Sequence, residues 1–119
     1  MHAVELLQSC LRSALEPMHA LRRDALLGSV SALIEGRRLV LMDLARSWPG
    51  YRRVAAPLKR VDRLLSNVHL AAEQESIYAA MGRWCLCQPQ PLIIVDWSPL
   101  NRRGNHYLLR AALAVGGRS

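Results

Sequence analysis

Apolar residues recur every three or four positions along the first three-quarters of the chain, the spacing that places them on one face of an α-helix. The pattern begins over 4–15, with Val4, Leu7, Leu11 and Leu15. It continues over the segments 18–35, 40–47, 56–68 and 70–85. Pro17, Gly36 and the turn sequence Trp48-Pro49-Gly50 separate these segments, as expected where helices end. The pattern therefore predicts five helices.

The pattern changes at Gln88-Pro89-Gln90-Pro91. The next residues, 92–95, form a continuous apolar, β-branched run that is typical of a buried strand, and Asp96 interrupts it. Residues 98–105 are polar and predict a loop, whereas 106–115 alternate in the way of a second strand. We therefore expect a mainly α chain, with a helical domain over 1–87 and the start of a sheet over 88–119.

The predicted helix over 56–68 has a basic side. At 100° per residue, four apolar residues fall on one side, namely Leu58, Val61, Leu65 and Val68. The cations near this helix are Lys59, Arg60 and Arg63 on nearly the opposite side, Arg52 and Arg53 in the turn before it, and Arg37 and Arg38 after the second predicted helix. A helix, a tight turn and a second helix with a basic face form the layout of a helix-turn-helix DNA-binding motif. An ordinary solvated charged face has the same pattern.

The net positive charge of the chain favours a polyanionic partner. The 119 residues include 16 Lys and Arg against 9 Asp and Glu, which gives a formal charge of +7, and a positive field of this size favours nucleic acid or an anionic membrane face. No stretch approaches the roughly 20 apolar residues of a membrane helix, and Glu5 and Gln8 interrupt any signal peptide. We therefore expect a cytoplasmic protein with no membrane partner and no small-molecule substrate.

Several stretches occur in a fixed order along the chain: Leu21-Arg22-Arg23, GRRLVLMDLARSWPG, LKRVDRLLSN, PLIIVDWSPL and HYLLRAALAVGGR. Together, over about 21–118, they resemble the N-terminal part of bacterial insertion-sequence transposases of the IS4 type. The resemblance implies a helical domain that binds the terminal inverted repeats of a mobile element as double-stranded DNA at the bacterial nucleoid. It also implies that 88–119 are the first β-hairpin of a ribonuclease-H-like α/β catalytic domain.

Asp96 is the candidate catalytic residue in this comparison. The family uses an Asp-Asp-Glu triad that holds two divalent ions, Mg²⁺ or Mn²⁺, and Asp96 at the end of PLIIVD matches the first Asp of that triad. A carboxylate supported by a buried strand is a suitable hard ligand for Mg²⁺, although a strand-end Asp that caps a loop is the alternative. No Asp or Glu follows Asp96, and family members are several times longer. We therefore expect a truncated front piece that binds no metal tightly and does not cleave DNA alone.

Two other functions fit the sequence, a stand-alone helix-turn-helix regulator and a helical protein-interaction module. Salt-dependent DNA binding separates the second of these from the DNA-binding functions. Self-association through the two strands is a further expectation, because an isolated hairpin with an apolar run is marginally stable in water.

Overall fold

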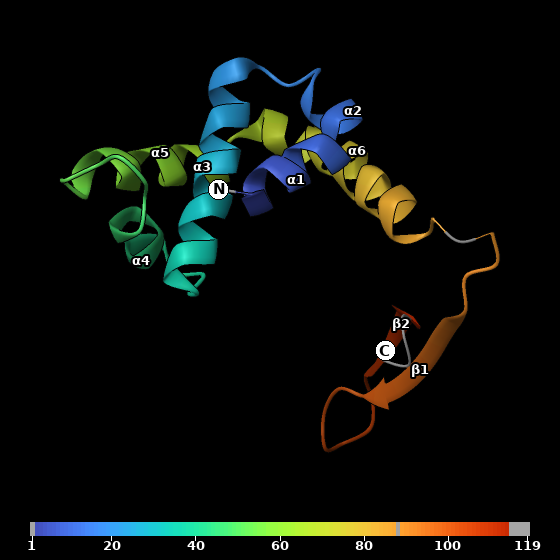
Figure 1. The fold of residues 1–119 in the computed structure, drawn as a ribbon. Coiled ribbons are helices and arrows are strands. Elements are labelled where there is room, and N and C mark those ends of the chain that lie inside the picture. The colour runs from blue at the N-terminus through green and yellow to red at the C-terminus, as the bar shows by residue number, and fades with distance from the viewer. Residues whose placement is uncertain (1, 88, 115–119) are drawn as a thin grey trace. The chain divides into compact units, whose positions relative to one another are not determined.

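The computed structural model describes residues 2–87 and 89–114. Within these residues six helices precede a two-stranded antiparallel sheet, so the predicted mainly helical class is confirmed (Figure 1). The chain divides into two compact units, 1–84 and 85–119, and each is described by itself. The end of the predicted second strand at Val115, the Gly-Arg sequence at 117–118 and Gln88 at the expected domain boundary lie outside the described residues.

The first predicted helix is two helices, α1 (His2–Cys10) and α2 (Arg12–Leu15), because the backbone leaves helical geometry at Leu11. One core cluster joins this region to α6 (Val68–Cys85). It contains Ala80 of α6 and four buried residues from the first two helices, the residue between them and the turn after them: Leu11, Ala14, Leu15 and Met18. The break at Leu11 thus turns the apolar side of α2 toward the same core.

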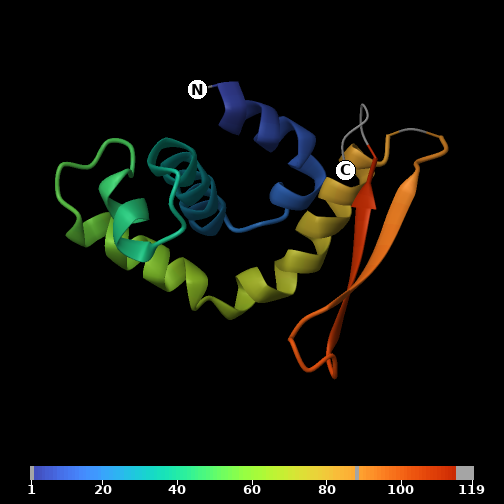
Figure 2. The same ribbon diagram turned by 90° about the horizontal axis from the view of Figure 1, so that it is seen from below.

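Three helices, α3 (Ala20–Gly36), α4 (Leu41–Arg46) and α5 (Ala55–Leu65), pack together and lie side by side in Figures 1 and 2. Their shared core contains Ala32, Leu44, Trp48 and Val61. Gly28 permits the close approach, because a Cβ atom there would lie 2.4 Å from Cζ2 of Trp48. The sequence predicts the end of α3 correctly at Gly36, and Arg37 takes the left-handed conformation there, with φ 54°.

The fourth predicted helix ends three residues earlier than expected, at Leu65. Asn67 then begins α6, because its side-chain Oδ1 accepts hydrogen bonds from the backbone N–H groups of His69 (2.9 Å) and Leu70 (3.4 Å). A side chain that satisfies these first amides stabilises a helix N-terminus. Val68 therefore belongs to α6 and not to α5.

The second unit is a hairpin of β1 (Ile93–Pro99) and β2 (Tyr107–Leu113), paired antiparallel with Asp96 opposite Arg110. The expectation that the strand stops at Asp96 is wrong, since β1 continues to Pro99 and the connecting loop is 100–106. The expectation of a buried strand is also wrong for the structure, because Ile93, Ile94 and Val95 are 45–61% exposed. Two strands alone provide no second layer to cover them.

Candidate nucleic-acid interface

Helix α5 has a buried side that differs from the predicted one. Pro57, Val61 and Leu64 are buried, whereas Leu65 is 71% exposed and Val68 75%. The spacing of the buried residues, four and then three, rotates the core-facing side toward Leu64. Lys59 and Arg63 remain exposed on the solvent side of the helix. The helix is therefore amphipathic, with cations outward, but its apolar side is not the one expected from Leu65 and Val68.

Arg60 is a correction to the predicted basic side. It lies at the edge of the buried side, half-buried, with its guanidinium carbon 5.8 Å from the centre of the Trp48 ring. One guanidinium nitrogen donates a hydrogen bond to the Tyr51 hydroxyl at 3.1 Å. The Arg60 guanidinium thus contacts one aromatic ring and one phenolic hydroxyl. Arg60 therefore helps to cover Trp48 and does not point opposite the core.

The connection between α4 and α5 is longer than the tight turn of a helix-turn-helix motif. It spans residues 47–54, whereas the turn of a helix-turn-helix motif has three or four residues. Trp48 is buried in it at 6% exposure, and Gly50 adopts the positive φ of 80° that makes the bend. Arg52 and Arg53 are exposed at its end, directly before α5. The pair α4–α5 is thus a helical hairpin with an ordered eight-residue connection.

The two cations after α3 have different surroundings. Arg38 lies 3.4 Å from Oδ2 of Asp43, and Arg46 lies 3.6 Å from Oδ1 of the same carboxylate. Asp43 therefore offsets part of their charge. Arg37 is exposed, and its left-handed backbone closes α3. Of this pair, Arg37 is the cation more accessible to an anionic ligand.

Four exposed cations form what we call the basic surface: Arg52, Arg53, Lys59 and Arg63. Within residues 2–87 and 89–114, none of these four side chains forms an ion pair. Arg63 also borders a cavity of about 320 Å³, which is lined by Arg22 of α3 and by His19, the residue before α3.

Sequence reasoning missed the roles of Arg22 and Glu73. Nε of Arg22 lies 2.7 Å from Oε2 of Glu73 and its NH2 group 2.5 Å from Oε1, a paired contact between α3 and α6 across 51 positions. The hydrogen bonds from Arg22 lower the pKa of the Glu73 carboxyl. No local periodicity identifies a pair so distant in sequence. The contact removes Arg22 from the cations free to meet an anion and joins α6 to α3.

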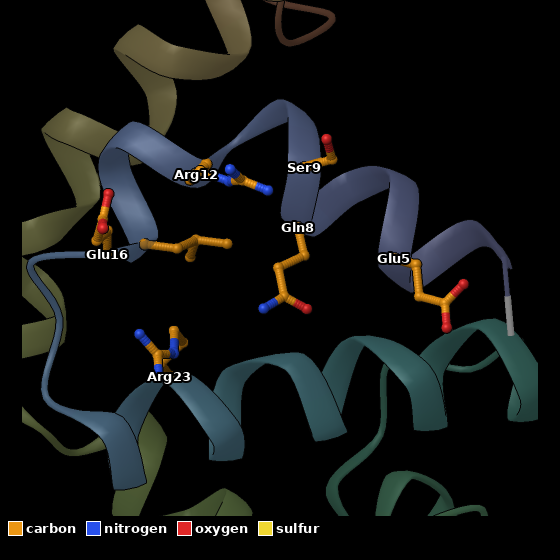
Figure 3. Close-up of a pocket in the computed structure, with 7 residues that line it drawn as sticks. Glu5, Gln8, Ser9, Arg12, Glu16 and Arg23 are labelled. Atoms are coloured by element: carbon orange, nitrogen blue, oxygen red, sulfur yellow. The ribbon is translucent and has the colours of Figure 1, made fainter.

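A second cavity, of about 370 Å³, lies between α1–α2 and α3. In Figure 3, Gln8 points into it from α1 and Arg23 from α3, while Arg12 lies at the start of α2 and Glu16 directly after that helix. Glu5 and Glu16 bring negative charge to the same lining as the two arginines. Because both signs of charge meet there, this cavity is less suited to a polyanion than the basic surface.

Asp96 lies in the middle of β1 and on an exposed face of the hairpin. Ser98 Oγ donates a hydrogen bond to its Oδ2 at 2.7 Å, and Arg110 donates to the same oxygen at 2.5 Å. The Ser98 hydrogen bond, followed by that of Arg110, lowers the pKa of the Asp96 carboxyl. This environment stabilises the carboxylate by partners within the hairpin.

The surroundings of Asp96 do not fit a divalent metal ion. Mg²⁺ requires several oxygen ligands in octahedral geometry and loses its waters reluctantly, but here a cation, Arg110, already contacts the carboxylate. In the part of the chain that the structure describes, no three His, Cys, Asp or Glu side chains are grouped to hold a metal ion.

Comparison with known proteins identifies no relative: no protein-family model, curated protein or solved structure matches the chain. Among the helices in the described residues, none is both long and apolar enough to cross a membrane.

Proposed function

We propose that the chain binds double-stranded DNA through the basic surface of Arg52, Arg53, Lys59 and Arg63. The observation that carries this proposal is that all four cations are exposed and lie on the outward side of α5 or directly before it. Within the residues that the structure describes, none of the four forms an ion pair. The formal charge of +7 adds a long-range attraction to the phosphate backbone.

Phosphate contacts supply most of the binding in this proposal. Arginine forms paired hydrogen bonds with phosphate oxygens, and each neutralised phosphate releases a counterion. The eight-residue connection before α5 distinguishes the unit from a compact helix-turn-helix motif. We therefore assign the basic surface to backbone contacts, which position a protein on the duplex, and not to reading particular bases.

Within this proposal, the DNA is the terminal inverted repeat of a mobile element and the chain is the front part of an IS4-type transposase. The ordered resemblance over about 21–118 supports this assignment, and an antiparallel hairpin over 93–113 is compatible with the start of a ribonuclease-H-like domain. Asp96 then occupies the position of the first catalytic carboxylate. Because Arg110 pairs with it, we expect the chain alone to neither hold Mg²⁺ nor cut DNA.

A helical protein-interaction module is the second candidate, and one observation favours it. Leu65, Tyr78 and Met81 border an apolar cavity of about 400 Å³ along α5 and α6, and each is at least 41% exposed. Apolar surface of this kind often marks a protein contact. A stand-alone DNA-binding regulator shares the basic surface with the leading proposal. It differs from that proposal in the DNA sequence bound and in giving Asp96 no catalytic ancestry.

Fluorescence anisotropy with a labelled duplex tests the proposal. The double variant Lys59→Gln/Arg63→Gln should bind at least about tenfold more weakly than the wild-type chain at low salt, because two phosphate contacts are lost. The matched control is Arg12→Gln/Arg83→Gln, which removes the same charge from exposed positions elsewhere in the helical unit. An equal loss in both variants would show that only net charge matters, and no binding by the wild-type chain would refute DNA binding.

Binding to the terminal repeats is tested separately. A duplex that carries the flanking terminal repeats should bind more tightly than a scrambled duplex of equal length and composition if the transposase assignment is right. Nicking of that duplex with Mg²⁺ or Mn²⁺, abolished by Asp96→Asn, would contradict the proposed inactivity of the chain alone.

A further inference from the structure

The two faces of the hairpin differ in composition. Alternate residues of a strand point to the same side, so the register of β1 and β2 fixes each face. One side, which we call the apolar face, consists of Ile93, Val95, Trp97, Pro99, Tyr107, Leu109, Ala111 and Leu113. It carries no charged group, and its polar side-chain atoms are the Tyr107 hydroxyl and the indole N–H of Trp97. The hairpin is thus amphipathic.

On the opposite face, the polar side chains form hydrogen bonds with one another. Asp96 accepts hydrogen bonds from Ser98 and Arg110, and Arg110 also donates to Ser98 Oγ at 3.1 Å. The side chains of Asp96 and Arg110 nevertheless remain 54% and 61% exposed. An antiparallel sheet can keep such a face in water while it buries the other. The face that requires a cover is therefore the apolar one.

The apolar face is large enough to be an interface. Five of its large side chains, Ile93, Val95, Trp97, Tyr107 and Leu109, are 52–63% exposed. At about 200 Å² for a large side chain, they present on the order of 500 Å² of apolar surface per hairpin. Contiguous apolar patches of several hundred Å² on soluble proteins mark interaction sites.

We propose that two copies of the chain associate by packing these apolar faces against each other. Two such faces bury on the order of 1,000 Å² in total, the area at which specific interfaces begin. Self-pairing also brings no like charges together, because the face carries none. The result is a two-layer sandwich with sheets about 10 Å apart, and with Asp96 and Arg110 on its outer surfaces.

The arrangement of side chains favours an antiparallel two-fold pairing. Trp97 and Tyr107 stack near one end of the face, with ring centres 5.8 Å apart and planes at 28°, whereas the smaller Ile93 and Leu113 lie at the other end. An antiparallel pairing places the aromatic end of one copy on the aliphatic end of its partner. It also separates the exposed loop cations Arg102 and Arg103 of the two copies, which a parallel pairing would bring together.

Sedimentation velocity of the full chain without DNA tests this proposal, and its outcome is independent of DNA binding. The wild-type chain should show a concentration-dependent dimer. Val95→Glu, on the apolar face, should raise the dimer dissociation constant about a hundredfold or more, because two unpaired carboxylates would be buried. The control Ile94→Glu changes the neighbouring residue on the opposite face and should change the constant about twofold at most. A monomeric wild-type chain, or equal effects of the two variants, would overturn the proposal.

Cross-linking gives a second measurement that requires no destabilising charge. In a background where Cys10, Cys85 and Cys87 are serine, a short thiol-reactive cross-linker should join Ala111→Cys chains into dimers, because Ala111 lies in a central row of the apolar face. Ala112→Cys, one residue along on the opposite face, should not cross-link. Equal cross-linking of both variants, or none of Ala111→Cys, would contradict face-to-face packing.

Discussion

Replacing Gly28 with alanine should destabilise the helical unit, because the added methyl group has no room. A Cβ atom there would lie 2.4 Å from Cζ2 and 2.9 Å from Cε2 of Trp48, well inside the roughly 3.5–4.0 Å of favourable carbon contacts. Trp48 is 6% exposed and packs with Val61, and Arg60 lies over its ring. The indole therefore cannot move aside without disturbing the core between α3 and α5.

The size of the effect combines two opposing contributions. Overpacking a core costs about 1–3 kcal/mol, and the overlap of about 1 Å with a buried ring places Gly28→Ala in the upper part of that range. Alanine in a helix interior is favoured over glycine by about 1 kcal/mol. The net loss should be about 1–2 kcal/mol, which lowers the Tm of a unit of this size by about 4–15 °C.

Thermal and urea unfolding followed by circular dichroism measure this loss, with Gly82→Ala as the matched control. Gly82 lies in α6, and an added Cβ there would meet no atom within 4 Å. The control should therefore gain up to about 1 kcal/mol from helix propensity alone. If Gly28→Ala were as stable as Gly82→Ala, the packing of α3 against Trp48 described above would be wrong.

Three further predictions concern the helical unit. Arg22 lowers the pKa of Glu73 in the folded chain, so the ion pair between them stabilises the fold when Glu73 is ionised. This stabilisation is complete above the unfolded pKa of about 4.3 and is lost as the pH falls below it. Glu73→Gln should remove that part of the pH dependence of Tm, whereas Glu75→Gln, at an exposed position, should retain it. Asn67→Ala should cost about 1 kcal/mol in urea unfolding by removing the cap of α6, and Asn67→Asp should cost little, so equal losses would contradict the cap. Arg60→Ala should cost about 0.5–1 kcal/mol in the same assay through the lost contact with an aromatic ring, and an unchanged midpoint would exclude that contact.

The positions of most elements follow from local sequence. Apolar spacing and stop signals such as Gly36 and Trp48-Pro49-Gly50 are read within one helix, and the predicted helices agree with the structure within a few residues. The break at Leu11 is the exception, because it depends on how α2 turns toward a core shared with distant Ala80. The end of β1 was also mispredicted, since Arg110 on the other strand satisfies Asp96 and allows the strand to continue.

Local sequence also predicts the basic surface only in part. Exposure of Lys59 and Arg63 follows from the helical repeat, whereas the position of Arg60 does not, because the repeat cannot show that Trp48 lies beside it. The exposure of Leu65 likewise depends on where α5 ends, which the cap of the next helix decides. Tertiary contacts thus determine which of the predicted cations are free to bind.

The salt dependence of duplex binding tests the central claim most directly. The logarithm of the binding constant falls against the logarithm of salt concentration by about 0.9 per neutralised phosphate. If the four cations of the basic surface each contact a phosphate, the slope should be about −3.6 for the wild-type chain and about −1.8 for Lys59→Gln/Arg63→Gln. Arg12→Gln/Arg83→Gln should keep the wild-type slope. The same slope for Lys59→Gln/Arg63→Gln as for the wild-type chain would contradict the account, because these two cations would then make no contact with DNA.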